Sequence, residues 1–367
     1  MKKILQEEYM RLALKLARKA EDETYPNPMV GAVIVKGKRI IGKGYHKRCG
    51  SDHAEIRAIK NASRGSSGSV MFVTLEPCDH YGKTAPCTDA IIAAGIKAVY
   101  IATGDPNPLN SGRGIKRLRD SGIRVDVGLC GAEARELNRK YIKFITKRLP
   151  YVTVKLAQSL DGKIAARDYS SKWITSPEAR KLVKKMRSKF NAIMVGSNTV
   201  SKDDPFLLDE KRRSSKVMRV VVDSRLKIPI DSNLVKTRNK APLVIGTTEL
   251  ASRNKEARLR KMDNIDIIRM GSKEGRVPLK TLLKSLAARG AVNILVEGGG
   301  RLVGSLMDGR LVDEVLFFIS PKIIGGSFSS IMGRGAANIR EAVRLENIKM
   351  RKIGGDILVR GRVCSRG

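Results

Sequence analysis

The chain has few of the residues that anchor proteins in membranes or cross-link them outside the cell. No apolar run approaches the roughly 18 residues that a membrane-spanning helix needs. The segment from Met1 to Ala20 is interrupted by Gln6, Glu7 and Glu8, which is unlike a signal peptide. Only five of the 367 residues are cysteine, and an odd number disfavours a disulfide framework. We therefore expect a cytoplasmic protein whose cysteines bind metal or are inert.

Acidic residues are scarce relative to basic ones. The chain has 36 Asp and Glu residues against 72 Lys and Arg residues, so its net charge is +36 at pH 7. Such a field attracts phosphorylated metabolites and nucleic acids alike. The basic residues recur through both halves without forming a single tail or stripe. This even spread indicates a general bias in composition rather than a dedicated binding surface. We therefore expect a small phosphorylated substrate and neither a specific nucleic-acid partner nor a membrane partner.

Hydrophobic periodicity predicts two α/β domains, for which the chain is long enough. In the first half the pattern predicts helices near residues 7–20, 53–62, 88–95 and up to about 122, and strands at 30–35, 39–45, 70–75 and 98–103. The pattern restarts at Tyr151 after a basic helical stretch, so we place the domain boundary between residues 148 and 149. The first half is thus predicted to be an α/β sandwich.

The second half is predicted to form a largely parallel sheet. Helices are expected at 177–190, 278–288 and 302–309, and strands at 151–157, 192–196, 219–223, 243–247, 265–270, 293–297 and 314–319. A closing hairpin is expected to turn at Gly354 and Gly355.

The three histidines, His46, His53 and His80, all lie within 35 residues of one another. His53 opens a predicted helix, Cys78 follows the strand over 70–75, and Cys87 starts the next helix. One imidazole and two thiolates suit a tetrahedral zinc ion whose fourth position is open to water. The sequence therefore predicts one zinc ion with His53, Cys78 and Cys87 as its ligands.

Glu55, two residues after His53, is placed like the general acid/base of the zinc deaminases, whose signature is His-x-Glu followed by Pro-Cys and a second Cys. A carboxylate beside a zinc-activated water can carry its proton to the leaving amine. We therefore expect hydrolytic deamination with Glu55 as the catalytic residue. The alternative is a closed structural zinc site with Cys49 or His80 as fourth ligand, but such a site has no use for Glu55.

Longer stretches of the first half resemble one family. They include Pro-Asn-Pro-Met-Val-Gly at 26–31, Gly-Tyr-His at 44–46, His-Ala-Glu at 53–55, the run from Leu75 to Cys87, and Asp-Pro-Asn-Pro at 105–108. These stretches resemble the deaminase domain of the bifunctional riboflavin-biosynthesis deaminase/reductases. Eight residues separate Cys78 from Cys87, whereas the two cysteines sit closer together in the shorter deaminases.

The resemblance implies a cytidine-deaminase-like α/β/α sandwich over residues 1–148. It also implies that a pyrimidine ribosyl phosphate is bound by Asn27, His46, His80 and Lys83. Considered alone, His80 is as compatible with a structural role as with a substrate contact. Ala85 and Asp52 stand where the family often has proline.

The second half resembles the reductase domain of the same family, which is similar in fold to dihydrofolate reductase. The matching stretches are 155–163, 171–175, 192–207, 222–224 and 297–299. The glycine-rich turn at 298–300 precedes a predicted helix and could aim N–H groups at a phosphate, but it lacks the Rossmann fingerprint. Over residues 149–367 the resemblance therefore implies a dihydrofolate-reductase-like α/β domain that uses NADPH.

The resemblance assigns site residues to this second domain. It implies that NADPH contacts Gln158, Trp173, Thr199, Asp203, Ser224, Gly299, Gly300, Arg301, Leu302, Val303, Gly304 and Ser305. It implies that the ribosyl phosphate contacts Lys155, Ser171, Arg187, Leu207 and Glu297. Ordinary core packing is the alternative for Trp173. Glu210 stands where the family tends to have a basic residue.

The family resemblance implies two consecutive reactions in riboflavin biosynthesis. The first is zinc-dependent deamination of 2,5-diamino-6-(ribosylamino)-4(3H)-pyrimidinone 5′-phosphate. The second is NADPH-dependent reduction of the ribosyl group, which gives 5-amino-6-(ribitylamino)uracil 5′-phosphate. We expect such an enzyme to be a homo-oligomer.

Two other functions compete with this interpretation. A nucleic-acid base deaminase with an accessory domain would suit the zinc ligands and the basic charge, but only 4% of the residues are aromatic and available for base stacking. A non-catalytic binding protein with structural zinc would leave Glu55 unexplained. Neither alternative accounts for both halves of the chain.

Overall fold

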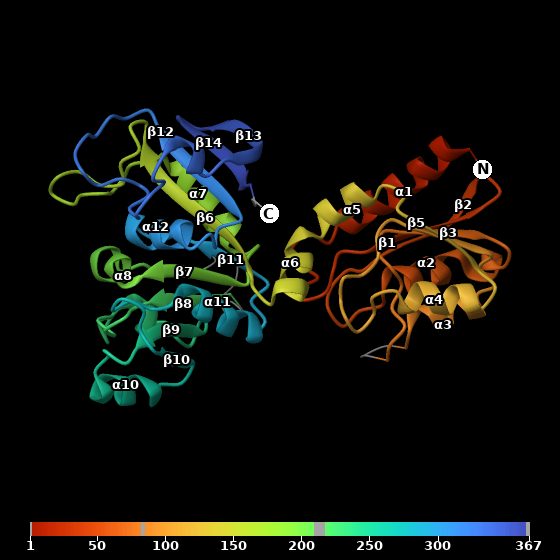
Figure 1. Cartoon of the computed structure of the whole chain (residues 1–367), viewed down its shortest axis with the longest axis horizontal. Helices are drawn as coiled ribbons and strands as arrows, with labels where there is room; N and C mark the ends of the chain where they lie inside the picture. The colour runs from red at the N-terminus through yellow and green to blue at the C-terminus, as the bar shows by residue number, and fades with distance from the viewer. Residues whose placement is uncertain (1, 82–84, 209–216, 365–367) are drawn as a thin grey trace. The chain divides into compact units, whose positions relative to one another are not determined.

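The structure, a computed structural model, describes residues 2–81, 85–208 and 217–364, with only the backbone of Arg64. Lys83 and Glu210, which the sequence singled out, lie outside these residues. The chain divides into two compact units, Met1–Arg148 and Leu149–Gly367, shown in Figure 1. Among the described helices, none combines the length and apolar character needed to cross a bilayer.

The first unit is built on a five-stranded sheet with the order β2-β1-β3-β4-β5. The antiparallel part pairs β1 (Gly31–Lys36) with β2 (Arg39–Tyr45) and with β3 (Val70–Val73). Parallel pairing then adds β4 (Ala98–Ile101) and β5 (Arg124–Val127). The helices of this unit are α1 (Lys3–Arg18), α2 (Ala54–Ala62), α3 (Cys87–Ala93), α4 (Arg113–Asp120), α5 (Gly131–Leu137) and α6 (Arg139–Lys147).

Both faces of this sheet are buried, and β1 shows why. Successive side chains of a strand point to opposite faces. Ala32 and Ile34 pack with residues of α2, α3 and α4, whereas Val33 and Val35 pack with residues of α1 and α5. Helices therefore cover the sheet on both sides, which confirms the predicted α/β/α sandwich (Figure 1).

The second unit contains a nine-stranded sheet with the order β10-β9-β8-β7-β11-β6-β12-β14-β13. Its parallel part consists of β6 (Tyr151–Ser159), β7 (Ala192–Gly196), β8 (Met218–Val222), β9 (Leu243–Thr248), β10 (Ile265–Met270), β11 (Asn293–Val296) and β12 (Glu314–Ser320). The hairpin of β13 (Leu345–Ile353) and β14 (Asp356–Val363) adds antiparallel strands, and it turns at Gly354 and Gly355 as predicted.

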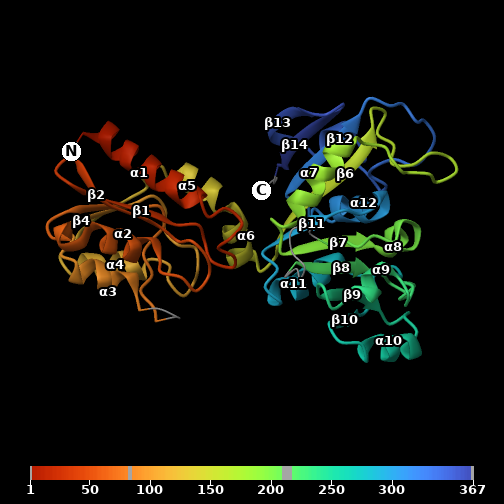
Figure 2. The same ribbon diagram turned by 180° about the vertical axis from the view of Figure 1, so that it is seen from behind.

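Helices cover this second sheet on both faces (Figure 2). One core contains residues of α11 (Leu279–Ala288) and α12 (Gly300–Asp308). Another contains residues of α8 (Ser197–Asp203), α9 (Asn233–Lys236) and α10 (Arg253–Arg260). Ala179 and Val183 of α7 (Pro177–Arg187) pack against β12 and β14. The second half is thus the predicted α/β domain with a largely parallel sheet.

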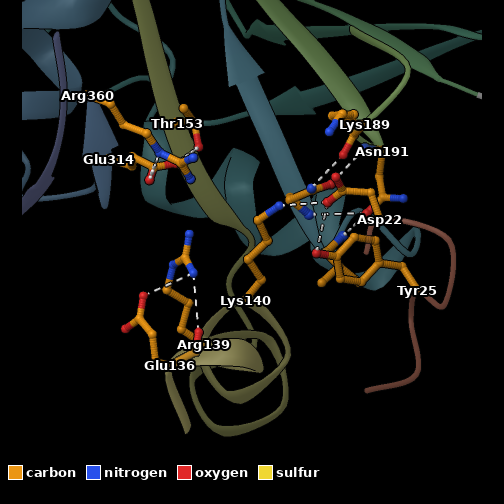
Figure 3. Close-up of polar contacts among 12 residues, drawn as sticks. Asp22, Tyr25, Glu136, Arg139, Lys140, Thr153, Lys189, Asn191, Glu314 and Arg360 are labelled. Carbon is orange, nitrogen blue, oxygen red and sulfur yellow. Dashed lines mark hydrogen bonds and ion pairs between the residues drawn. The ribbon is translucent and has the colours of Figure 1, made fainter. Parts of the chain in front are cut away.

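Each unit contains buried charged side chains that are paired. In the second unit, Glu314 on β12 accepts hydrogen bonds from Arg360 on β14 (2.8 Å) and from Thr153 on β6 (3.4 Å), so one carboxylate joins three strands (Figure 3). In the first unit, Lys140 on α6 donates to Asp22 at 2.9 Å, and both side chains are largely buried.

Candidate active sites

The first candidate site contains His53, Cys78 and Cys87. His53 is the N-cap residue of α2, Cys78 lies in the loop after β3, and Cys87 is the first residue of α3. Their ligand atoms all lie within 4.8 Å of one another. His53 Nδ1 is 3.2 Å from Cys87 Sγ and 3.5 Å from Cys78 Sγ. Because zinc–ligand bonds of about 2.0–2.3 Å place tetrahedral ligands roughly 3.5 Å apart, this arrangement fits a zinc ion.

The two thiols differ in acidity. Cys87 N–H donates to Cys78 Sγ at 3.4 Å. The side-chain hydrogen bond from Cys87, supported by the one with His53, lowers the pKa of Cys78. The same contact with Cys78, together with burial, raises the pKa of Cys87. At least one thiolate is therefore favoured here, and the thiolate is the form of cysteine that binds metal.

Glu55 lies in the first turn of α2 and is 3% exposed. Burial, together with the negative charge of Cys78, raises the pKa of Glu55 to about 7. A carboxyl group with such a pKa exchanges its proton readily near neutral pH, which suits a general acid/base.

Asn27 and His46 adjoin the ligand cluster. The ring of His46 meets that of His53 edge-on, with centroids 5.2 Å apart. His46 Nδ1 is 3.3 Å from the carbonyl oxygen of Asp52, so Nδ1 carries the hydrogen and Nε2 accepts from Asn27 Nδ2 at 3.2 Å. Burial lowers the pKa of His46 and favours its neutral form. His80 is half-buried, and its Nδ1 has no hydrogen-bond partner among the described residues.

The second candidate site begins with three charged residues predicted to bind substrate. Arg187 ends α7 and donates to both carboxylate oxygens of Glu297, which follows β11, at 2.7 and 3.1 Å. Lys155 projects from β6, and its pKa is lowered by burial, although Glu297 acts in the opposite direction. Burial alone would raise the pKa of Glu297, but the charges of Arg187 and Lys155 outweigh burial and lower it. The fold therefore joins these three residues in one largely buried charged cluster.

Several residues predicted to bind cofactor follow neighbouring parallel strands. Thr199 lies just after β7, Ser224 after β8 and Gly299 after β11. Gln158, near the end of β6, has a buried Oε1 without a hydrogen-bond partner in the described part of the chain. The carboxyl ends of parallel strands are the usual place for ligands in open α/β sheets. These positions fit a dinucleotide that lies along this edge of the sheet.

Trp173 is 61% exposed, so the alternative of ordinary core packing is wrong. Arg180 lies over its ring at 4.3 Å from the centroid, and Lys322 donates to its carbonyl oxygen at 2.8 Å. Beside Trp173 there is a cavity of about 420 Å³ that these two cations and Ser320 help to line. The sequence did not point to Arg180 or Lys322, and they carry no motif that could have revealed them.

The remaining predicted residues lie in more varied surroundings. Asp203 ends α8 and is exposed, and Ser171 is half-buried in the loop before α7. The side chain of Leu207 is 4% exposed and packs in a hydrophobic core, so a ligand there would meet mainly backbone. Ser224 Oγ already accepts from Val277 N–H at 3.1 Å.

Residues 299–305 form the N-cap and first turns of a helix, which begins two residues earlier than the predicted start at 302. Gly299 is the N-cap residue and α12 begins at Gly300, so Arg301, Leu302, Val303, Gly304 and Ser305 are helical. A Cβ at Gly300 would lie 2.5 Å from the carbonyl oxygen of Ser329, and one at Gly304 would lie 2.3 Å from the backbone of Met332. These two glycines therefore permit close packing of α12 against the segment 329–332.

A metal-binding deaminase sandwich followed by a reductase-type α/β domain defines a bifunctional enzyme class. The family models agree with both halves. Residues 3–103 match the cytidine and deoxycytidylate deaminase zinc-binding region, and residues 150–359 match the RibD C-terminal domain.

Full-length relatives identify the family. The chain is 42% identical over 352 residues to the riboflavin biosynthesis protein RibD of Aquifex aeolicus, covering 96% of each chain. It is 36% identical over 365 residues to RibD of Escherichia coli, covering 96% of this chain and 97% of the relative. The structure of Acinetobacter baumannii RibD matches with a TM-score of 0.84 at 31% identity, covering 99% of this chain and 100% of the other.

A fourth relative, from Thermotoga maritima, is described as a diaminohydroxyphosphoribosylaminopyrimidine deaminase/5-amino-6-(5-phosphoribosylamino)uracil reductase. Its structure matches with a TM-score of 0.81 at 34% identity, covering 99% of each chain. The chain belongs to the RibD family and is a bifunctional deaminase and reductase of riboflavin biosynthesis.

Proposed function

We propose that residues 1–148 form the deaminase domain, with zinc bound by His53, Cys78 and Cys87, and that residues 149–367 form an NADPH-dependent reductase domain. The observation that carries the proposal is the buried Glu55 carboxyl group beside three ligand atoms that lie within 4.8 Å of one another. A closed structural zinc site has no use for a buried proton-exchanging group next to its ligands.

In the deaminase domain, bound zinc would supply an activated water at neutral pH. Glu55 accepts a proton during the attack on the pyrimidine ring and returns one to the departing amine, for which a pKa of about 7 is suited. Asn27 and His46 bind the substrate beside the cluster, and His80 and Lys83 complete the set inferred from the family. The hydrogen bond from Asn27 fixes the ring of His46. Burial lowers the pKa of His46 and favours its neutral form.

In the reductase domain, bound NADPH would supply a hydride. Gln158, Trp173, Thr199, Asp203, Ser224 and the N-terminal part of α12 hold the cofactor along the carboxyl edge of the sheet. Lys155, Ser171, Arg187, Leu207 and Glu297 hold the ribosyl phosphate. The Glu297 carboxylate keeps Arg187 in a fixed orientation. Lys155 can stabilise negative charge on the ring-opened sugar, because its buried ammonium group is poorly screened by water.

The names of the relatives support the substrates. The Thermotoga maritima relative is named for a diaminohydroxyphosphoribosylaminopyrimidine and for a 5-amino-6-(5-phosphoribosylamino)uracil. We propose that this chain acts on the same two compounds in succession, with deamination first.

The decisive experiment measures ammonia release under anaerobic conditions. The zinc-loaded protein is incubated with 2,5-diamino-6-(ribosylamino)-4(3H)-pyrimidinone 5′-phosphate, with and without NADPH, beside the Glu55→Gln variant. Native protein should release ammonia without NADPH and oxidise NADPH only after deamination. Glu55→Gln should keep its zinc but lose roughly 10²–10⁴-fold in deamination rate, because the proton carrier is removed.

Other outcomes of this experiment are equally informative. If native protein with stoichiometric zinc releases no ammonia, the deaminase assignment is wrong and a nucleic-acid base or a structural zinc site becomes the better interpretation. If NADPH is oxidised before any ammonia appears, the proposed order is wrong.

We also propose that the enzyme is a cytoplasmic homo-oligomer. The strand β13 supports assembly because it lies at one edge of the nine-stranded sheet, where Ile348 and Met350 are 56% and 68% exposed. Light scattering after size exclusion should give at least twice the mass of one chain, 40.3 kDa. A single peak at the mass of one chain would refute the oligomer.

A further inference from the structure

A fully buried amide, that of Asn110, lies directly behind the candidate metal site. Asn110 belongs to the connection between β4 and α4 and has 0% exposure. Its Oδ1 accepts from the backbone N–H of Asp79 at 2.9 Å, and its Nδ2 donates to the carbonyl oxygen of Pro77 at 3.4 Å. One side chain thus binds the backbone on both sides of Cys78.

The orientation of this amide is fixed by its surroundings. Nδ2 also donates to Asp105 Oδ2 at 3.3 Å. The other oxygen of Asp105 accepts from the hydroxyl of Tyr141 at 2.9 Å and from Asn107 N–H at 3.0 Å. Because Nδ2 faces two acceptors and Oδ1 faces a donor, the reversed amide would lose these three hydrogen bonds.

The segment around Cys78 is also held from its other side. The carbonyl oxygen of Cys78 accepts from Thr88 N–H at 3.3 Å, and Thr88 Oγ1 donates to Asp79 Oδ1 at 2.7 Å. Thr88 is the residue after Cys87, so these bonds tie the two cysteine segments together. Asn110, by contrast, lies outside both cysteine segments and binds the backbone next to Cys78 from there.

We propose that Asn110 is a positioning residue of the metal site. By fixing the peptide groups before and after Cys78, it directs Cys78 Sγ toward His53 and Cys87 before the metal binds. Residues that orient metal ligands typically contribute to affinity although they do not touch the metal. The inference rests on the proposed zinc site, and it concerns metal affinity rather than the chemistry of deamination.

The test uses the full chain with Asn110→Leu and Asn110→Asp, and zinc affinity is measured by competition with a chromophoric chelator. Asn110→Leu removes both backbone contacts. Asn110→Asp keeps the size and an acceptor for Asp79 N–H, but turns an oxygen toward Pro77 O and Asp105. Both variants should bind zinc about 10- to 100-fold more weakly. With cobalt(II) in place of zinc, the visible absorption bands should shift, because the thiolate of Cys78 is no longer held in one direction.

Asn138→Leu is the matched control. Asn138 is also a buried asparagine of this unit, 2% exposed, and it binds the backbone N–H and carbonyl of Met29 at 2.8 and 2.9 Å. Its loss should disturb the fold comparably while leaving zinc affinity and the cobalt spectrum close to native.

Three results would overturn the proposal. Folded Asn110 variants that bind zinc within twofold of native would show that the amide only packs the loop. Equal losses in Asn138→Leu would show a general effect of lost stability. If the native protein binds no zinc, the proposed zinc site itself is wrong. This outcome is distinguishable from the other two because it is seen without any substitution. If Asn110→Leu does not fold, the near-isosteric Asn110→Asp decides the test.

Discussion

Two largely buried carboxyl groups, those of Glu55 and Glu297, have pKa values displaced in opposite directions. Burial and the charge of Cys78 raise the pKa of Glu55 to about 7. Burial acts in the same direction on Glu297, but Arg187 and Lys155 outweigh it and lower the pKa. Glu55 can therefore exchange a proton near neutral pH, whereas Glu297 remains a carboxylate that binds cations.

Replacing Glu297 should change the pH dependence of reduction. Glu297 raises the pKa of Lys155 against the effect of burial and of Arg187. In Glu297→Gln this support is lost, so the pKa of Lys155 falls further. If the Lys155 ammonium group is needed for reduction, the alkaline limb of the kcat/KM profile should move to lower pH, in addition to a loss of rate. Steady-state NADPH oxidation across a pH series measures both effects.

Glu314→Gln provides the control for this experiment. Glu314 is another buried, arginine-paired carboxylate of the second unit, bonded to Arg360. Its replacement should lower the free energy of unfolding without shifting the alkaline limb of the kcat/KM profile. If the alkaline limb of the kcat/KM profile does not move in Glu297→Gln, the protonation of Lys155 does not determine the pH dependence of reduction.

Among the elements, α12 depends on glycine for its packing. A Cβ at Gly304 would lie 2.3 Å from both the carbonyl carbon and the oxygen of Met332, which are backbone atoms and cannot rotate away. Gly304→Ala should therefore push α12 from the segment 329–332 and lower the free energy of unfolding of the second unit by about 1–3 kcal/mol. The KM for NADPH should rise as well, since α12 carries proposed cofactor residues.

Urea unfolding measures the first effect, with Gly271→Ala for comparison. A Cβ at Gly271 would meet nothing within 4 Å, and its backbone lies outside the left-handed region. Equal stabilities of the two variants would contradict the packing role of Gly304.

A strand with continuous apolar sequence was predictable, whereas one short, highly polar helix was not. β7 has the predicted bounds, because Ala192–Gly196 is a short apolar run of the kind that forms strands in parallel sheets. β10 (Ile265–Met270) also has the predicted bounds, although Asp266 and Arg269 interrupt its apolar residues. The helix α10 was missed because its sequence, RNKEARLR, buries only Glu256 and Leu259. Glu256 pairs with Arg260 one turn later in the same helix and with Arg269 on β10. The contact with Arg269, which only the fold creates, helps to hold this helix in place.

The residues of the candidate sites also fall into two groups, those that the sequence predicted and those that it did not. His53, Glu55, Cys78 and Cys87 were identified from local spacing, because the chemistry requires those residue types near element ends. Arg180 and Lys322 were not predicted as site residues, although both contact Trp173. Lys322 is 149 residues from Trp173 in sequence, and only the strand order brings them together.

At the scale of the whole molecule, each unit has hydrophobic cores of its own. We therefore expect two unfolding transitions in calorimetry. Chelating the zinc should lower one transition by about 10 °C and leave the other in place, because a ligand stabilises only the unit that binds it. A parallel drop in both transitions would show that the units unfold together.

The strand order has a consequence for synthesis on the ribosome. β6 is the first strand of the second unit to be made, yet its neighbours are β11 and β12, with Tyr151 opposite Asn293 and Thr153 opposite Glu314. Thr153 and its partner Glu314 are 161 residues apart. Most of the second unit must therefore be synthesised before this interior strand can pair with its neighbours. Until then an apolar strand is exposed, and chaperones that bind such segments have their longest opportunity during this interval.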